Sequence, residues 1–373
     1  MSDKIRILQV FGSMNRGGAE TMIMNMYRNI YRDKMQFDFV VHKTDKGDYD
    51  DEIYDLGGNI FYCERYNVIN HFSYEKWWNK FFDEHKEYKI IHAHATGPAA
   101  VYIPIAKKHG LFAISHSHIA LSQKGFRQAV NNMYRKPLVN ISDYMFACSR
   151  EAGFWMFGND IENKSNYRVF NNAVDTEIFK YNENKRNEKR KELKLENNFV
   201  ITNVSRFHEQ KNHTFIIDIF EKVYEKNKNS KLLLVGDGML KSEIENKVRD
   251  KGLQECVIFT GVRSDIPEIL QASDVVLFPS LREGLPVALV EAQASGLKVI
   301  CSDTISKEVK ITNLVEMYSL SDSSEKWANE ILKYYEGYDR KDMSDEIKKA
   351  GYDIKSSAKW LQEFYENILI KKR

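Results

Sequence analysis

Long hydrophobic runs are missing from this sequence. No stretch approaches the roughly 20 apolar residues that a membrane-spanning helix needs, and a strand pattern starts at Ile5 without an apolar leader segment before it. We therefore expect any membrane contact to be peripheral. An excess of one charge is also missing, since 55 Lys and Arg face 53 Asp and Glu, for a net charge of +2. So weak an overall field does not recruit nucleic acid, and we expect no such partner.

Cysteine is scarce and widely spaced. The four residues, Cys63, Cys148, Cys256 and Cys301, form no Cys-x-x-Cys pair. This pattern is typical of reduced thiols in a cytoplasm. We therefore expect a cytoplasmic protein that can also touch the inner face of a membrane.

What the sequence does contain is an alternation of strand and helix patterns. A length of 373 residues with 43% hydrophobic and 29% charged residues suits two globular domains. Strands that alternate with helices predict parallel, doubly wound sheets, which bind ligands beyond the carboxyl ends of their strands. The main strand patterns lie at 5–11, 37–42, 57–62, 88–94, 110–118, 142–149, 199–205, 231–236, 257–261, 274–278 and 298–302.

The domain organisation follows from a change in composition at 181–198. Lys and Arg alternate there with Glu and Asn, which predicts a solvated linker or a helix with self-compensating charge at the boundary between the domains. We therefore expect one domain over 1–180 and another over 199–355. The remaining segment, 356–373, is an amphipathic helix pattern that must bury its apolar stripe, and we expect it to cross back over the first domain.

The stretch 274–294 is where the sequence points most strongly to chemistry. A buried strand pattern is followed by a loop with Glu283, then by a helix pattern with Pro286 at its first turn and Glu291 about two turns further on. A helix start offers free N–H groups and a positive dipole end, which favour phosphate or a developing anion. The two carboxylates suit sugar hydroxyls and a ribose. The ordinary alternative is a solvated loop Glu and a surface ion pair.

Two further loops follow strand patterns. Gly12 to Gly18 lets the backbone approach a phosphate or a sugar, or forms a plain tight turn. Arg206 and Lys211 place two permanent cations after the strand at 199–205, which suits a diphosphate, unless they are simply surface bases.

Histidines stand in two His-x-His pairs at predicted strand ends. These are His92 with His94 and His116 with His118. Three roles remain open for them: a shared metal ion, structural hydrogen bonding, and contact with a substrate or the reacting groups.

The segment 122–136 carries apolar residues on one stripe with basic residues beside it. It suits an anionic membrane surface, an acidic acceptor or a solvated helix face.

Several of these loops together match one pattern. In succession they resemble the family-4 retaining glycosyltransferases of the GT-B fold over nearly the whole chain. The segments 116–118 and 302–312 look like the branch that builds bacterial exopolysaccharide and capsule. The resemblance implies two doubly wound Rossmann-like domains facing a cleft. It rests on Gly17-Gly18-Ala-Glu20, His92-Ala-His94, Ser205-Arg206 with Gln210-Lys211-Asn212, Gly236-Asp-Gly238, and Glu283-Gly-Leu-Pro with Glu291.

The resemblance also implies roles for single residues. Glu291 would bind the nucleotide ribose, Glu283 the hydroxyls of the donor sugar, and Arg206 with Lys211 the diphosphate. His118 would be the active-site histidine, with His116 as the alternative, so that the catalytic set is His118, Glu283, Arg206 and Lys211. The amides of Gly17, Gly18, Gly284 and Leu285 would flank the donor, and Gly236 and Val262 complete the predicted donor site.

The activity implied by the resemblance is the transfer of a hexose-type sugar with retention. The donor would be a nucleotide sugar, UDP-linked, and the acceptor a glycan or a lipid-linked glycan of a bacterial surface polysaccharide. We expect no metal and no other cofactor, because cations and helix ends can stabilise the diphosphate leaving group. Rival hypotheses are a sugar-nucleotide epimerase of similar fold, a noncatalytic nucleotide-sugar sensor and a His-x-His metallohydrolase.

Overall fold

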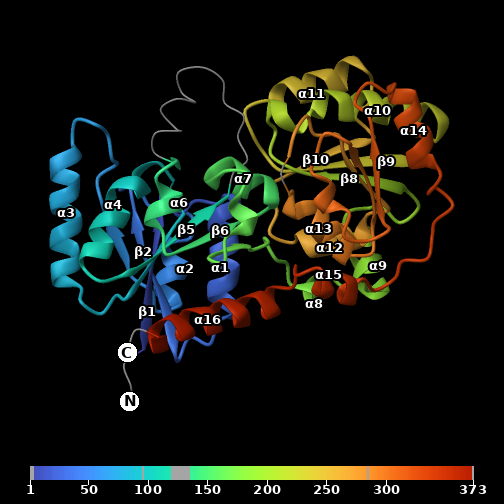
Figure 1. Cartoon of the computed structure of the whole chain (residues 1–373). Coiled ribbons are helices and arrows are strands. Elements are labelled where there is room, and N and C mark those ends of the chain that lie inside the picture. The colour runs from blue at the N-terminus through green and yellow to red at the C-terminus, as the bar shows by residue number, and fades with distance from the viewer. Residues whose placement is uncertain (1–3, 95, 119–134, 284, 372–373) are drawn as a thin grey trace. The chain divides into compact units, whose positions relative to one another are not determined.

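The chain folds into two compact units. A computed structural model describes residues 4–94, 96–118, 135–283 and 285–371. The first unit comprises residues 1–173 together with 354–373, and the second comprises 174–353. Each unit contains one parallel sheet with helices on both faces (Figure 1). The predicted pair of doubly wound α/β domains is confirmed.

The sheet of the first unit has seven strands in the order β3-β2-β1-β4-β5-β6-β7. The strand order reverses direction between β1 and β4, where doubly wound sheets bind their ligands. The strands are β1 (Ile5–Phe11), β2 (Met35–Val41), β3 (Ile60–Tyr62), β4 (Ile90–Ala93), β5 (Phe112–Ser117), β6 (Tyr144–Ala147) and β7 (Tyr167–Val169).

Helices cover both faces of this sheet because side chains of a strand alternate between the faces. In β1, Ile7 packs into a core with α1, α2 and the last helix, α16 (Ile354–Lys371), whereas Leu8 packs into a separate core with α3, α4 and α7. The helices are α1 (Gly18–Asn29), α2 (Asp50–Asp55), α3 (His71–Glu84), α4 (Thr96–Lys108), α6 (Leu138–Ile141) and α7 (Arg150–Phe157), with a 3₁₀ turn η1 (Ile161–Asn163).

The second unit repeats this architecture with a six-stranded sheet. Its order is β10-β9-β8-β11-β12-β13, and the strand order reverses direction between β8 and β11. The strands are β8 (Phe199–Val204), β9 (Ser230–Val235), β10 (Val257–Gly261), β11 (Val275–Phe278), β12 (Lys298–Ser302) and β13 (Val315–Tyr318).

Its helices again form two layers. One core joins the sheet to α10, α11 and α14, and the other face packs against α8, α12, α13 and α15. The helices are α8 (Thr176–Phe179), α9 (Glu183–Glu192), α10 (His213–Lys226), α11 (Lys241–Asp250), α12 (Ile266–Ala272), α13 (Val287–Ala294), α14 (Ser324–Leu332) and α15 (Ser344–Lys349), with 3₁₀ turns η2 (Glu209–Lys211) and η3 (Lys307–Val309).

The charged segment 181–198 contains a helix, one of the two predicted alternatives, but it is neither fully solvated nor the boundary between the units. Residues 183–192 form α9, which packs against α12 inside the second unit. Lys189 and Arg190 are buried, and Lys189 Nζ lies 2.8 Å from Asp265 Oδ2. The physical reason is that these cations have fixed partners in the tertiary structure, which composition alone does not show. The division between the units falls instead at residue 173.

The last helix belongs to the first unit, as expected. α16 (Ile354–Lys371) packs beside α1 and places Leu361 and Tyr365 in the same core as Phe37 (Figure 1). The apolar stripe predicted in 356–373 is therefore the side of a helix that covers one face of the first sheet.

The four cysteines are buried and unbonded to one another. No helix among the described residues is both long and apolar enough to cross a bilayer. The predicted amphipathic segment 122–136 lies outside the described residues, except for its last two positions.

Candidate functional site

Three loops of the second unit meet at one edge of its sheet. They follow β8, β9 and β11, which are neighbours, so the carboxyl ends of these strands lie together. Here Lys211 Nζ lies 2.5 Å from Glu283 Oε1, and both side chains are mostly buried. The Lys211 ammonium also lies 5.0 Å from the centre of the Phe278 ring. Two residues that are 72 positions apart in sequence thus form one charged centre.

The loop that carries Glu283 is held by its neighbours. Gln210 Nε2 donates to Arg282 O at 2.6 Å and to Glu283 Oε1 at 3.1 Å, and Leu281 N donates to Gln210 O at 2.8 Å. On the other side, the amide of Ser306 donates to Glu283 O at 3.2 Å. These contacts fix the carboxylate before any ligand arrives.

The loop after β12 supports the same segment, which the sequence did not reveal. Ser302 Oγ and Thr304 Oγ1 both donate to Ser280 O, at 2.5 and 2.9 Å. Small hydroxyl residues directly after a strand are the only signal that could have indicated this, and it is a weak one.

Steric crowding explains why glycine occupies two positions in the loop after β9. A Cβ at Gly236 would lie 2.2 Å from Ser205 O, and a Cβ at Gly238 would lie 2.4 Å from Phe207 O. Both also have positive φ angles, 139° and 156°. Only glycine fits there, and it lets the β9 loop pack directly on the loop that carries Arg206.

Glu291 lies on α13, and its carboxyl group has no hydrogen bond or ion pair to any described residue. Burial raises the pKa of its carboxyl group to about 7, because the low-polarity surroundings disfavour the charged form. A half-buried carboxyl group without a partner is costly in a folded protein. It is therefore suited to a ligand that supplies hydroxyl donors.

The other predicted donor residues have different surroundings. Arg206 is exposed at the end of β8, and Val262 is 67% exposed just after β10. Leu285 is half-buried before α13, whereas Gly284 lies outside the described residues. The expected pair of cations is divided, since Lys211 is paired with Glu283 and Arg206 is open to solvent.

In the first unit, Gly17 and Gly18 stand at the start of α1. Gly17 is its N-cap in extended conformation, and Gly18 has no atom within 4 Å of where its Cβ would be. The open helix start confirms the strand, loop and helix arrangement expected there. A ligand role for these amides stays a prediction.

The two His-x-His pairs lie on one face of the first sheet. Gln9 of β1 pairs with His92 of β4, and His92 pairs with Ile114 of β5. Residues two apart on a strand share a face, so all four histidines join Gln9 there. Their rings stack, with His92 and His116 at 5.3 Å and 9°, and His116 and His118 at 4.0 Å.

Hydrogen bonds connect this cluster to α16. His94 Nε2 lies 2.9 Å from Gln9 Oε1, and His94 Nδ1 lies 2.7 Å from His118 Nε2. Tyr365 Oη lies 2.6 Å from His92 Nδ1. Structural hydrogen bonding, one of the three roles left open, is thus present.

Burial keeps these rings neutral. It lowers the pKa values of His92, His94 and His116 well below the usual value, and it lowers the pKa of His118 to about 3. Within the described part of the chain, His92, His94 and His116 bring ring nitrogens within 4.8 Å of one another, a set of donors that a metal can use. Both nitrogens of His94 are already hydrogen-bonded, which competes with that use.

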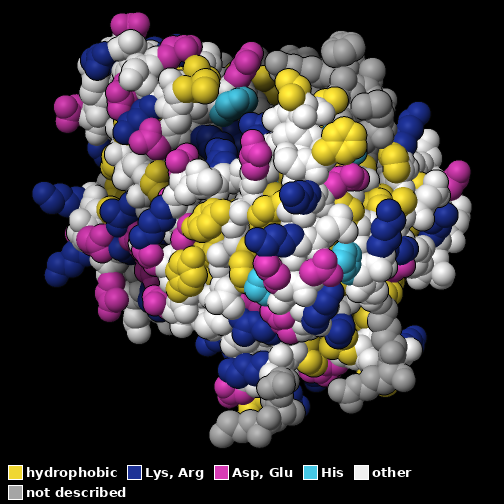
Figure 2. Space-filling view, turned by 90° about the vertical axis from the view of Figure 1, so that its left-hand side faces the viewer, with side chains coloured by type: hydrophobic (Ala, Val, Ile, Leu, Met, Phe, Trp, Pro, Cys, Tyr) yellow, Lys and Arg dark blue, Asp and Glu magenta, His cyan; other side chains and the backbone are white. Residues whose placement is uncertain are grey.

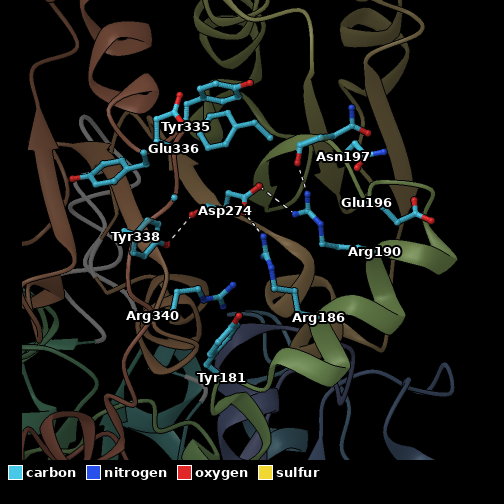
Figure 3. Close-up of a pocket in the computed structure, with 14 residues that line it drawn as sticks. Tyr181, Arg186, Arg190, Glu196, Asn197, Asp274, Tyr335, Glu336, Tyr338 and Arg340 are labelled. Atoms are coloured by element: carbon cyan, nitrogen blue, oxygen red, sulfur yellow. Dashed lines mark hydrogen bonds and ion pairs between the residues drawn. The ribbon is translucent and has the colours of Figure 1, made fainter.

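A cavity of about 420 Å³ in the second unit lies at the opposite edge of the sheet, beside Phe199 and Asp274 at the amino ends of β8 and β11 (Figure 3). Arg186, Arg190 and Arg340 line it, and their guanidinium groups donate to carbonyl groups at the end of α12. These guanidinium groups therefore supply the hydrogen bonds that the last carbonyl groups of a helix lack, and they are not free to bind a diphosphate.

Both units match known families. The family described as "Glycosyltransferase Family 4" matches residues 16–178, and "Glycosyl transferases group 1" matches residues 184–353. EpsF of Bacillus subtilis (strain 168), named as a glycosyltransferase, is 33% identical over 100% of this chain and 98% of its own length. The chain belongs to glycosyltransferase family 4. It is an enzyme, a glycosyltransferase, as the loop motifs predicted.

A second relative and a solved structure are also similar to this glycosyltransferase. The capsular polysaccharide biosynthesis glycosyltransferase CapH of Staphylococcus aureus is 25% identical over 97% of this chain and 98% of its own. The crystal structure of Anabaena HepE with UDP and glucose matches with a TM-score of 0.78 and 20% identity, and the match covers 97% of this chain and 99% of HepE. The GT-B fold expected from the sequence is confirmed, and relatives of this transferase act in polysaccharide biosynthesis.

Proposed function

We propose that the protein transfers a hexose-type sugar from a UDP-sugar to a growing surface polysaccharide, with retention of the anomeric configuration. The observation that carries this proposal is the unpartnered carboxyl group of Glu291 on the helix that follows the loop of the Lys211–Glu283 centre. Vicinal ribose hydroxyls donate two hydrogen bonds to a carboxylate, which supplies the missing partner. HepE, which has the same fold, binds UDP and glucose.

The Lys211–Glu283 pair then has two states. Without a donor, the ammonium and the carboxylate neutralise each other at 2.5 Å. When a donor binds, the ammonium of Lys211 pairs with the diphosphate instead, and the carboxylate of Glu283 accepts hydrogen bonds from the sugar hydroxyls. Arg206 is exposed on the same loop as Lys211, and we propose that it adds a second cation for the diphosphate.

The chemistry needs no other group in this proposal. The bond between the anomeric carbon and the diphosphate oxygen breaks, and an acceptor hydroxyl forms a bond to that carbon on the same face. The hydroxyl proton passes to the departing diphosphate oxygen on the same face, and UDP is the second product. Charge develops on the leaving diphosphate, so the Lys211 and Arg206 cations and the start of α13 lower the barrier.

The acceptor is a glycan or a lipid-linked glycan, and we propose that the first unit rests on the membrane that holds it. Val68, Ile69 and Phe72 are 72%, 97% and 82% exposed, at the start of α3. Two basic residues near them, Arg65 and Lys76, are exposed as well. The face on the α3 side mixes hydrophobic side chains with both charges (Figure 2). Exposed apolar groups flanked by cations suit an anionic bilayer surface.

One experiment separates this proposal from its rivals. The purified protein is incubated with UDP-glucose, UDP-galactose and UDP-N-acetylglucosamine, each with and without an undecaprenyl-diphosphate glycan acceptor. We expect a product heavier by one sugar, with the donor's anomeric configuration by NMR, and no loss of rate in EDTA. An isomeric UDP-sugar formed without acceptor would instead indicate an epimerase. Stoichiometric bound metal with loss of rate in EDTA would favour the hydrolase.

Matched variants test the site itself. Arg206→Met and Glu291→Ala should each lower kcat/KM at least about 100-fold if these groups hold the diphosphate and the ribose. Arg249→Met, a change of an exposed arginine on α11, is the control and should leave kcat/KM unchanged. Full activity of both site variants would contradict the proposal.

A further inference from the structure

We propose that Gln9 and Tyr365 are positioning residues that fix the tautomer of His118, so that its Nδ1 presents a lone pair to the reaction. The inference rests on the proposed function, in which His118 is the histidine of the transfer site. It concerns residues of the first unit alone. It assigns the last helix of the chain a part in the chemistry.

The contacts form one continuous chain of hydrogen bonds. Gln9 Nε2 donates to Tyr365 Oη at 3.4 Å, and Gln9 Oε1 lies 2.9 Å from His94 Nε2. His94 Nδ1 then lies 2.7 Å from His118 Nε2. Gln9 and Tyr365 are fully buried, so water does not compete for these bonds.

The order of donors and acceptors follows from the chemistry of neutral imidazole. Such a ring has one N–H group and one bare nitrogen. The Gln9 oxygen can only accept, so His94 carries its proton on Nε2 and its Nδ1 is bare. His118 must then donate from Nε2, which leaves its Nδ1 bare. That atom is buried and has no hydrogen-bond partner among the described residues.

Tyr365 determines which atom donates in each hydrogen bond of this network. If the Gln9 amide group were turned around, its NH₂ group would face His94, and every proton up to His118 would move to the other nitrogen. In the structure the Gln9 amide group is oriented with its Nε2 donating to Tyr365 Oη, so the Tyr365 oxygen is the acceptor that holds this orientation, and its hydroxyl proton is then directed to His92 Nδ1, 2.6 Å away. The orientation of Gln9 is thus set from α16.

The consequence for the reaction is specific. Burial holds the pKa of His118 at about 3, so at neutral pH the ring is not a cation that could stabilise a phosphate. A bare Nδ1 accepts a hydrogen bond. His118 therefore selects a ligand that presents a hydroxyl group, on the donor sugar or on the acceptor, and excludes a bare carbonyl or phosphate oxygen at that position.

The test uses the full-length protein labelled with ¹⁵N-histidine. Long-range ¹⁵N–¹H spectra distinguish a protonated from a bare ring nitrogen, and comparison with the His118→Asn protein assigns the signals of His118. We expect a proton on Nε2 in the wild type. In Tyr365→Phe and in Gln9→Met, the two nitrogen signals of His118 should move toward each other as both tautomers become populated, and kcat should fall about tenfold with KM nearly unchanged.

Tyr27→Phe is the matched control. Its hydroxyl group is also buried and donates to Gln36 Oε1, in the same core but away from the histidines. We expect no change in the His118 signals or in kcat.

Three results would overturn the inference. They are a wild-type proton on Nδ1 of His118, a Tyr365→Phe protein with unchanged His118 signals, and a stoichiometric metal whose removal shifts those signals. Because the spectra do not depend on turnover, absence of transferase activity would contradict the proposed function and leave this inference standing.

Discussion

The carboxyl group of Glu291 sets the pH dependence that we expect for donor binding. Its pKa of about 7 means that below neutral pH the free protein carries a proton on this group. Ribose hydroxyls bind the ionised form, so affinity should rise with pH through neutrality and level off above it. The slope below pH 7 should approach tenfold per pH unit, with proton release on binding.

Titration calorimetry with UDP-glucose between pH 5.5 and 8.5 checks this. This donor, unlike UDP, has no phosphate monoester that titrates in the same range. Glu291→Gln should bind weakly and without pH dependence, whereas Glu243→Gln, an exposed change on α11, should behave as wild type. If the affinity for UDP-glucose changed with pH equally in wild type and in Glu291→Gln, Glu291 would not be the group that binds the ribose.

The same carboxyl group affects stability with the opposite sign. A raised pKa means that the folded protein keeps its proton while the unfolded chain loses it near pH 4.5. Its contribution to stability is therefore favourable below that value and is lost as pH rises to about 7. Unliganded Glu291→Gln should be more stable than wild type above pH 7 for this reason.

At the scale of elements, the strand ends and the loops that follow them could be predicted, but their partners could not. Glu283, Lys211 and Glu291 were identified because strand and helix patterns place them at a carboxyl edge. The 2.5 Å pairing of Lys211 with Glu283 depends on how two loops pack, and no local pattern encodes it.

Other misses at this scale have the same cause. The strand β13 at 315–318 was not predicted, because it is a short edge strand and is mostly half-buried. In the segment 181–198, the charge pattern allowed the helix α9 but did not show that its cations have buried partners inside the second unit.

The end of α12 gives a prediction about stability. Arg340 donates to the carbonyl groups of Leu270, Gln271, Ser273 and Ser295 beside the cavity, and burial lowers its pKa to about 10. Arg340→Met removes the donor to the Leu270 and Ser295 oxygens, whereas Arg186 still donates to those of Gln271 and Ser273, so we expect a loss of about 3 kcal/mol.

Calorimetry or circular dichroism should show this loss as a fall in Tm of about 6–12 °C. Arg249→Met on α11 removes a guanidinium group that bonds only Asn246 among the described residues, and it should leave Tm within about 1 °C. A Tm unchanged in Arg340→Met would show that water satisfies the carbonyl groups.

At the scale of the whole molecule, the exposed apolar residues of the first unit predict membrane binding. Ile69→Ser with Phe72→Ser should lower partitioning onto vesicles that contain phosphatidylglycerol by more than about tenfold, because the apolar area that enters the bilayer is lost.

Vesicle flotation measures this effect, with Ile370→Ser as control. Ile370 is 68% exposed on α16, so the control also removes an exposed isoleucine. Neutral phosphatidylcholine vesicles should bind less of the wild-type protein. Equal binding by the double variant would exclude the region around residues 68–72 as the contact.

The overall architecture was the best predicted level. Doubly wound units, a C-terminal helix that returns to the first sheet and the family itself followed from the alternation of strands and helices and from the succession of loop motifs. The position of the division at residue 173 did not, because it is set by packing that the charged composition of 181–198 obscures.

The return of α16 to the first unit has a consequence for how the protein is made. The first sheet is synthesised early, yet the helix that covers one of its faces follows 180 residues later, after the whole second unit. During translation that face carries α1 and α2 but not α16, so part of it stays open to chaperones, whereas the second unit can fold as a continuous segment. Tyr365 reaches His92 only when α16 docks, so, with the role proposed for His118, transfer competence is the last property that a nascent chain acquires.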